Sequence, residues 1–402
     1  MKISFNFNID IDLKNSELKT ILKGYAIFSQ KILDQFVQQV ITVFAEEYMR
    51  LKEKPFKCEK CGENIKFIWK THHGRKTGIL TEFKKIILEQ LQVQCCNCKH
   101  KFYITRWLLG LEPRKIIPID TIRKLGLIGA LTTYRVSEKI ISIFGIAINK
   151  MMVWRSVQKT GEDIQFDLDP EEEAEGEADG TGIPIQGIQK RGKEIKVFVQ
   201  KKKGGGVRVA GLSIGNYDSG WNKLFKPLIP ALKKFEKFLL VTDGDTNIFK
   251  PLKKIVNVLV QRCLWHIPHQ MKYYLWKDKV KRKSAKYIYV LSELLEICAI
   301  PKQVKDDKII DRIIQSKEER LENLMSYCDK EGYQNCLTYL TNAKNDMFTA
   351  FKNRLNGKTT SHAERVMRTI NMRINVGKWS LEGALNVNKV RLAYYYNGFD
   401  VD

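Results

Sequence analysis

The chain has 402 residues, and its 69 Lys and Arg against 45 Asp and Glu give a formal net charge of +24. A hydrophobic content of 44% supports two or three domains with cores of their own. No stretch resembles a signal peptide or an apolar span of about 18 residues, which argues against secreted and membrane-embedded classes. The nine cysteines, several of them in paired spacing, favour metal ligation in a reducing compartment over disulfide bonds.

The acidic residues are concentrated in one segment. Residues 162–179 hold ten Asp or Glu and no Lys or Arg, so the rest of the chain has 69 basic against 35 acidic residues, a net charge of +34. An excess of lysine can reflect solubility or an AT-rich genome. A polyanionic partner explains it better, because Lys and Arg that neutralise phosphates release condensed counterions and gain affinity from that release.

Residues 1–54 form an N-terminal segment in which residues 11–51 are predicted to be helical. Apolar side chains recur there at intervals of three or four residues and make one face, for which packing or a dimer contact is the default expectation. That face comprises Leu22, Tyr25, Phe28, Ile32, Phe36, Val40 and Val43.

Residues 55–110 contain two C-x2-C pairs that bracket β-rich runs at 65–70 and 79–93, with a His-His-Gly-Arg turn at 72–75 between them. Four thiolates are the ligands of a tetrahedral structural zinc site with no open position for a substrate. We therefore expect a zinc ribbon. Cys96 leaves the register of the second pair open, His100 could replace one ligand, and unligated buried cysteines are the alternative. The expected Zn²⁺ ligands are Cys58, Cys61, Cys95 and Cys98.

Residues 111–160 are predicted to form a helix-turn-helix. On the third helix, Lys150 and Arg155 are available to contact DNA together with Trp154. An ordinary helical hairpin is the alternative. The expected elements are a first apolar helix at 122–131, a second helix that begins near Ser137, a turn at 144–146 and a third helix at 149–158.

Residues 161–178 are interpreted as an acidic, solvated linker. Glu175 and Glu177 are not taken as ligands, because they precede the strand that we expect to begin at Asp179. From Asp179 onwards the pattern becomes α/β, with glycine-containing turns that favour antiparallel hairpins among the first three strands. The expected order is strands 179–187, 194–200 and 207–215, a helical stretch 224–238 whose beginning Pro227 and Pro230 break up, a strand 239–242, a short helix and a strand 256–260.

Residues 267–355 are predicted to be wholly helical and to interrupt an α/β core made of residues 179–266 and 356–402. Basic residues alternate with aromatic ones at the start of this insertion, a composition typical of a DNA-binding surface, although a solvated lysine-rich helix is the alternative. The basic residues expected to contact DNA there are Lys277, Lys281, Arg282 and Lys283.

Three carboxylates at the edges of distant elements are the candidate catalytic residues: Asp179, Asp243 and Glu364. Asp179 and Asp243 would lie side by side if the first and fourth strands are neighbours, and a later helix would bring Glu364 to them. Three such carboxylates can hold two Mg²⁺ or Mn²⁺ ions, which can drive phosphodiester chemistry.

Each carboxylate also has a structural alternative. Asp179-Gly180 and Asp243-Gly244 are common turn dipeptides. Ser361-x-x-Glu364 fits a capping box, and Glu364 can also pair with Arg368 one helical turn later.

Several other residues close to these carboxylates in the sequence have more than one possible role. Asp245 competes with Asp243, although strand alternation favours Asp243 at the site and Asp245 as the cap of a short helix near Thr246. Cys263 and His266, in a C-x2-H spacing, could bind a metal with His269, position DNA or stabilise the core. Arg365 and Arg368, together with Arg373, follow the third carboxylate and are expected to face phosphates.

The residues from about 175 to 400 resemble the Mutator-like superfamily of insertion-sequence DDE transposases. The resemblance rests on an Asp-Gly in the first strand, an Asp-Gly after the fourth, a Gln-x-Cys-x2-His, a helical insertion and a Glu followed by arginines. Its most specific part is Gln261-Arg262-Cys263-Leu264-Trp265-His266. The front half resembles, more loosely, the zinc-ribbon and helix-turn-helix arrangement of some insertion-sequence transposases.

The resemblance implies a multidomain α+β protein with a ribonuclease H-like catalytic core. It also implies Mg²⁺-dependent cleavage of double-stranded DNA at element ends, followed by strand transfer to target DNA by a 3′-hydroxyl. We further expect a homo-oligomer on DNA, no membrane partner and a cytoplasmic, nucleoid-associated location of prokaryotic type. The competing classes are a transposase-derived DNA-binding protein without catalysis and a nuclease on the same fold.

Overall fold

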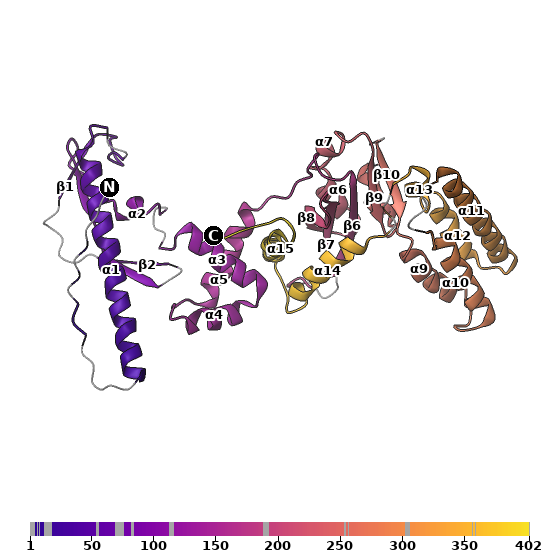
Figure 1. Ribbon diagram of the computed structural model, residues 1–402, viewed down its shortest axis with the longest axis horizontal. Coiled ribbons are helices and arrows are strands. Elements are labelled where there is room, and N and C mark those ends of the chain that lie inside the picture. The colour runs from indigo at the N-terminus through magenta and orange to yellow at the C-terminus, as the bar shows by residue number, and fades with distance from the viewer. Residues whose placement is uncertain are drawn as a thin grey trace. The chain divides into compact units, whose positions relative to one another are not determined.

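A computed structural model shows a mixed α and β chain that divides into two compact units at Thr160 and Gly161 (Figure 1). The structure describes residues 5, 7, 9–11, 18–53, 56–68, 76–81, 84–111, 116–187, 193–252, 255, 257–301, 306–355, 357 and 359–401.

The first unit begins with one long helix and two small antiparallel sheets. The three-stranded sheet has the order β1-β4-β5, and β2 pairs with β3 in a hairpin. The β-rich run predicted at 79–93 contains parts of three strands, β2, β3 and β4, and the chain reverses between the first two, where Thr81 accepts a hydrogen bond from the Lys84 N–H. The predicted turn at 72–75 lies outside the described residues. The elements are α1 (Leu18–Arg50), β1 (Ile65–Phe67), β2 (Lys76–Leu80), β3 (Lys85–Glu89), β4 (Gln92–Cys95), β5 (Lys101–Tyr103) and α2 (Thr105–Leu108).

The face of α1 that packs differs from the predicted one. Ile41 and Ala45 are buried in the core of this unit, whereas Tyr25 of the predicted face is 66% exposed. The reason is the position of β3, whose Ile86 and Leu88 alternate with exposed residues and offer only one side to the helix. The apolar stripe of Leu22, Tyr25, Phe28 and Phe36 is left exposed on the opposite side.

Three short helices close the first unit, as the sequence predicts. The second helix begins at Tyr134, three residues earlier than expected, because Thr133 caps it by accepting a hydrogen bond from Val136 N–H. Gly145, at a φ of +77°, lies in the turn that follows. The helices are α3 (Ile119–Leu131), α4 (Tyr134–Ile143) and α5 (Lys150–Asp163), the last of which ends just inside the second unit.

The second unit is built on a five-stranded sheet of order β10-β9-β6-β7-β8. β6, β7 and β8 are antiparallel neighbours, while β9 pairs in parallel with both β6 and β10. The strands are β6 (Glu175–Ile183), β7 (Lys193–Lys201), β8 (Val207–Gly215), β9 (Phe238–Thr242) and β10 (Val258–Arg262).

The first strand of this sheet corrects the interpretation of the acidic segment. β6 begins at Glu175, so the end of the predicted linker is part of the sheet. Further upstream, Asp167 and Asp169 both pair with Arg208 of β8. The sequence pattern did not predict the start of this strand, because a run of carboxylates normally indicates a solvated segment.

Helices cover both faces of the sheet. Ala178 points into the core that α6 covers, so its neighbours Glu177 and Asp179 point to the opposite face. On that face α14 crosses β6 and β7 (Figure 1). The helical stretch predicted at 224–238 consists of two short helices, with the break near Pro227 that the sequence predicts, and it ends at Leu232, earlier than expected. The helices are α6 (Gly220–Phe225), α7 (Ile229–Leu232), α8 (Thr246–Phe249), the 3₁₀ turn η1 (Lys250–Leu252), α14 (Ser361–Ile374) and α15 (Leu381–Tyr396).

The described residues between 267 and 355 are helices and turns, as predicted, with a hydrophobic core of their own. The Arg262 guanidinium donates two hydrogen bonds to the Asp346 carboxylate, at 2.8 and 3.1 Å, and both side chains are largely buried. This pair fastens the helices to the end of β10. The helices are α9 (His266–Lys277), α10 (Ala285–Cys298), α11 (Asp307–Lys330), α12 (Gln334–Lys344) and α13 (Thr349–Lys352).

Candidate metal and catalytic sites

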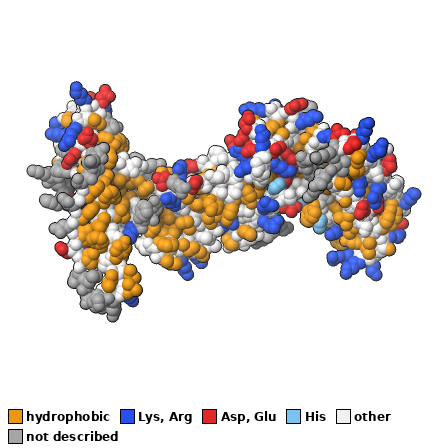
Figure 2. Space-filling model, in the orientation of Figure 1, with side chains coloured by type: hydrophobic (Ala, Val, Ile, Leu, Met, Phe, Trp, Pro, Cys, Tyr) orange, Lys and Arg blue, Asp and Glu red, His pale blue; other side chains and the backbone are white. Residues whose placement is uncertain are grey.

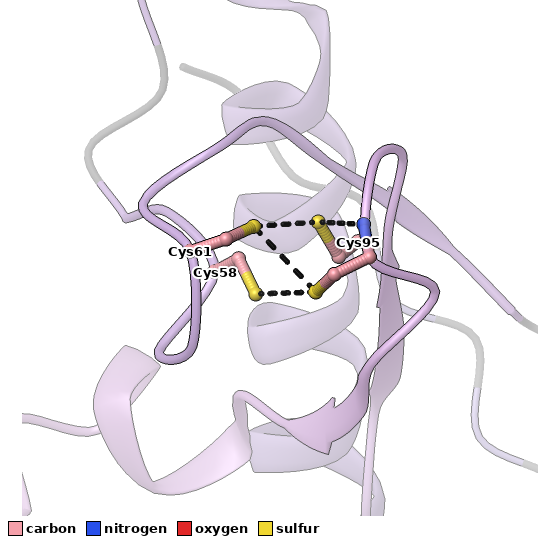
Figure 3. Close-up of side chains that lie close together, drawn as sticks. Cys58, Cys61 and Cys95 are labelled. Atoms are coloured by element: carbon pink, nitrogen blue, oxygen red, sulfur yellow. Dashed lines mark hydrogen bonds between the residues drawn. The ribbon is translucent and has the colours of Figure 1, made fainter.

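Four cysteines of the first unit converge on one point. Cys95 ends β4 and is paired in register with Ile65 of β1, which brings the turn after β4 to the loop before β1. The Sγ atoms of Cys58 and Cys98 are 3.6 Å apart, and that of Cys61 lies 3.3 Å from Cys95 and 3.5 Å from Cys98 (Figure 3). All four sulfur atoms lie within 4.8 Å of one another.

Backbone N–H groups point at two of these sulfur atoms. Lys60 N–H donates to Cys58, and Asn97 and Cys98 N–H both donate to Cys95. Burial would raise the pKa of Cys95, but these donors and the neighbouring thiols lower it to about 6. Thiolates are the form that binds soft divalent metals. The cluster can therefore hold a metal ion such as zinc.

The structure also settles the register of the second pair. Cys96 is exposed and lies outside the cluster, and its N–H donates to Asn64. The His100 ring stacks on Phe102, with ring centroids 5.8 Å apart. Neither residue replaces a cysteine in the group of four.

In the second unit, Asp179 lies in β6 and Asp243 directly follows β9, the parallel neighbour of β6. β6 and β9 are parallel, with Glu177 opposite Val241. Each aspartate lies two residues beyond that pair and therefore points to the same face of the sheet. Burial, together with the charges of Asp243 and Glu364, raises the pKa of Asp179 to about 6, against the lowering effects of the Gly180 N–H hydrogen bond and of His266.

Glu364 lies in the first turn of α14, the helix that packs on this face. Its Oε1 is 3.5 Å from Nε2 of His266. The capping-box alternative is wrong, because Ser361 is already the first helical residue and the cap residue Thr360 has no side-chain capping bond. Glu364 and Asp243 thus both act electrostatically on Asp179.

The carboxylates are less tightly gathered than the cysteines. Among the described residues, the cysteine cluster is the one group of three or more potential ligands whose ligand atoms all lie within 4.8 Å.

Cys263 and His266 hold the start of α14. The buried Cys263 thiol accepts a hydrogen bond from Thr360 N–H at 3.3 Å, and His266 Nδ1 lies 3.4 Å from Thr360 Oγ1. Burial would lower the pKa of His266, but Cys263, Asp243 and Glu364 raise it. His269 is exposed and stacks on Trp265 instead. The C-x2-H spacing therefore supports the third carboxylate rather than forming a metal site with His269.

Asp245 has the structural role that strand alternation predicts. Its side chain accepts a hydrogen bond from Asn247 N–H at 2.9 Å and caps α8. Its own N–H donates to Asp243 Oδ1, also at 2.9 Å. Gly244, at a φ of +96°, permits the turn between the two acids.

Sequence reasoning missed Glu177. This residue is fully buried in β6, and its Oε2 accepts hydrogen bonds from His362 and Ala363 N–H at 2.9 and 2.8 Å. The alternation of Glu175, Glu177 and Asp179 at every second position was the signal that could have placed them in one strand.

Cavities flank the carboxylates. One of about 620 Å³ is lined by Glu177, His269 and His362 among others. Another of about 740 Å³ is lined by Asp243, Tyr217 and other residues. Both are open to solvent.

The basic residues singled out by the sequence are exposed in both units. Figure 2 shows blue side chains gathered at the lower end of the helices that follow β10. Lys277 also lies over the Tyr273 ring, 4.9 Å from its centroid. The exposed basic residues are Lys150 and Arg155 on α5, Lys277 on α9, Lys281, Arg282 and Lys283 before α10, and Arg365 and Arg368 on α14.

In the part of the chain that the structure describes, no helix combines the length and the apolar character needed to cross a membrane. Comparison with known proteins found no matching family model and no significantly similar curated protein.

Proposed function

We propose that this protein is a DDE transposase that cuts and joins double-stranded DNA. The observation that carries the proposal is the placement of Asp179 in β6 and of Asp243 directly after β9, the parallel neighbour of β6, with Glu364 on the helix that packs on the same face. These carboxylates come from three distant segments in the order that the resemblance requires.

The sheet supports a ribonuclease H-like core. Its first three strands in sequence are antiparallel and its fourth and fifth run parallel to the first, with the order 3-2-1-4-5 when the strands of this unit are counted from β6. A ribonuclease H-like core places its first catalytic acid on the central strand and its second after the adjacent parallel strand. Asp179 and Asp243 have these positions.

Asp179, Asp243 and Glu364 would hold the two Mg²⁺ or Mn²⁺ ions. When bound, such ions activate the attacking oxygen and stabilise the leaving oxygen of a phosphodiester. His266, whose pKa is raised by Cys263 and the carboxylates, lies beside Glu364 and partly offsets the negative charge of the site. Arg365 and Arg368 project from the same helix into solvent, where they can contact phosphates.

The reaction would have two steps. Water attacks a phosphodiester at the element end, which breaks the bond to the 3′-oxygen and leaves a free 3′-hydroxyl. That hydroxyl then attacks a phosphodiester of the target, and the displaced target 3′-oxygen leaves as its bond breaks. Both steps need the same in-line geometry at phosphorus.

The first unit would recognise the DNA ends. A structural Zn²⁺ at Cys58, Cys61, Cys95 and Cys98 would fix the small sheet as a zinc ribbon. On α5 the exposed Lys150 and Arg155 are placed to contact a groove or phosphates, in the manner of a helix-turn-helix recognition helix.

The exposed stripe on α1 supports assembly into a homo-oligomer. Leu22, Tyr25, Phe28 and Phe36 are each at least 36% exposed on a helix of 33 residues. A contiguous apolar face of this kind is typical of a protein–protein contact. Sedimentation of the full chain with and without DNA would test it, and a monomer under both conditions would reject it.

The function is tested on the DNA that flanks the gene. Inverted repeats bounded by short direct duplications would identify the element ends. The purified protein should cut those ends in the presence of Mn²⁺ and join them to a target duplex, and Asp179→Asn should do neither while still binding DNA. Cutting without joining would indicate a nuclease, and binding without either reaction would indicate a non-catalytic DNA-binding protein.

A further inference from the structure

The first turn of α14 has an unusual capping partner. The first four N–H groups of any α-helix have no acceptor within the helix. Thr360, the cap residue of α14, has no side-chain capping bond. Two of the orphan N–H groups, those of His362 and Ala363, donate instead to Oε2 of Glu177, which lies 185 and 186 residues earlier in the chain.

The environment of Glu177 makes this contact strong. The side chain is fully buried, and a buried carboxylate needs hydrogen bonds and a positive partner to remain in the fold. The N-terminal end of α14 supplies both, because its N–H groups and the helix dipole favour a negative charge. Glu177 Oε1 has no hydrogen-bond partner among the described residues, so the capping contact is made by one oxygen alone.

The position of this contact connects two of the candidate catalytic acids. Glu177 lies two residues before Asp179 on β6, and Ala363 immediately precedes Glu364 on α14. A shift of the first turn of α14 relative to β6 therefore moves Glu364 relative to Asp179. Misplacement of a catalytic group by about 1 Å can cost roughly a hundredfold in rate.

We propose that Glu177 is a positioning residue, which caps α14 from β6 and thereby sets the separation of Asp179 and Glu364. The capping contact stands by itself, whereas its effect on catalysis rests on the proposed function. A direct role of Glu177 as a metal ligand is the competing explanation, and the experiments below separate the two.

Hydrogen exchange in the wild-type protein tests the cap without any variant. The amides of His362 and Ala363 should be protected, although first-turn amides ordinarily exchange quickly. Lys308 N–H of α11 is a matched comparison, because it also donates to a carboxylate, that of Asp306, but at an exposed helix end. The amides of His362 and Ala363 should exchange at least about tenfold more slowly than the amide of Lys308. Equal rates would overturn the proposal.

Two substitutions separate capping from metal ligation. Glu177→Gln keeps an acceptor oxygen, so it should preserve the protection of both amides and keep the half-saturating Mn²⁺ concentration for DNA cleavage within about threefold of wild type. Glu177→Met keeps the volume without an acceptor. It should speed exchange at both amides and raise the half-saturating Mn²⁺ concentration by about tenfold or more.

Glu175→Gln is the control substitution. Glu175 lies on the same strand, but it pairs with Lys201 rather than with α14, so its loss should leave the exchange of His362 and Ala363 unchanged. A tenfold rise in the half-saturating Mn²⁺ concentration for Glu177→Gln, with its amides still protected, would show that Glu177 is a ligand and reject the proposal. If the wild-type protein shows no metal-dependent cleavage, the proposed function fails, whereas the exchange data still decide the capping role.

Discussion

The cysteine cluster of the first unit and the carboxylate cluster of the second differ in how closely their ligand atoms gather. The four sulfur atoms lie within 4.8 Å of one another, and backbone N–H groups already point at them. Asp243 and Glu364 both act electrostatically on Asp179, but the three carboxylates do not form such a group among the described residues.

The difference follows from the chemistry of the ligands. A thiol can be neutral, so four of them can approach closely before a metal arrives. Carboxylates at neutral pH repel one another, and the neighbouring Asp243 and Glu364 add to the effect of burial in raising the pKa of Asp179. A closed sulfur cluster suits a structural metal, whereas separated carboxylates leave positions open for a substrate.

The largest effect should come from removing the metal of the cysteine cluster. Cys95→Ser should abolish binding of about one equivalent of Zn²⁺ and unfold the small sheets, because a structural zinc site can supply on the order of 10 kcal/mol of folding free energy. Cys96→Ser is the matched control, since Cys96 is exposed and outside the cluster. Metal content and thermal unfolding of the full chain provide the measurement. A Cys95→Ser protein that unfolds like wild type would remove the structural role of the cluster.

At the carboxylate cluster the effect should be on activity rather than on folding. Asp243→Asn should reduce Mg²⁺-dependent cleavage and joining by more than the roughly 10- to 100-fold that loss of an outer-shell partner costs, and DNA binding should persist. Asp245→Asn should cost about 1 kcal/mol of stability or less, since Asn also caps helices well, and should leave activity in place. Strand transfer by both variants on the same DNA is the measurement. Activity in Asp243→Asn with none in Asp245→Asn would reverse the two assignments.

Burial of Asp179 beside two other carboxylates predicts a pH dependence of stability that a cation should reverse. The pKa of Asp179 is about 6 in the folded chain, against an ordinary value of 3.8. The folded state therefore holds this proton more tightly, and stability should fall as pH rises from 4 to 6, by on the order of 3 kcal/mol. Saturating Mg²⁺ should offset that loss.

The same measurement on a variant isolates Asp179. Burial also raises the pKa of Glu177, from 4.5 to about 7, so Glu177 contributes a loss of the same sign that extends to higher pH. Asp179→Asn should remove only the part of the pH dependence of stability that Asp179 contributes. It should also remove most of the stabilisation by Mg²⁺. Thermal unfolding at pH 4, 5, 6 and 7 tests this, and a slope identical to wild type would show that Asp179 ionises freely.

The smallest effect per residue concerns the basic surfaces, which occur in both units. With several phosphate contacts, affinity for duplex DNA should fall by roughly a hundredfold or more between 50 and 200 mM salt. Lys150→Ala in the first unit and Lys281→Ala in the second should each reduce the salt slope by about one. Fluorescence anisotropy over a salt series provides the measurement. A change for only one of them would assign DNA binding to that unit alone.

Local patterns predicted the parts of the fold that depend on neighbouring residues. The helices within 119–158 and the strands around β7 and β8 lie close to their predicted bounds, because amphipathic periodicity and glycine turns act over a few residues. Asp245 was correctly predicted to be a helix cap for the same reason. Local pattern was misleading where charge density suggested a linker, since residues 175–178 are in fact part of β6.

The sequence by itself identified the four cysteines as a metal-binding group. Each C-x2-C pair already has the spacing of two metal ligands, so the fold only has to bring the two pairs together. The sequence also determined which acids were candidates for catalysis. Three contacts were decided only by the tertiary structure. Glu177 caps α14, Cys263 accepts a hydrogen bond from Thr360, and α1 packs on the core of the first unit with a different face from the predicted one. Each of these contacts joins segments far apart in the chain, and no local pattern records which buried donor a distant acceptor will meet.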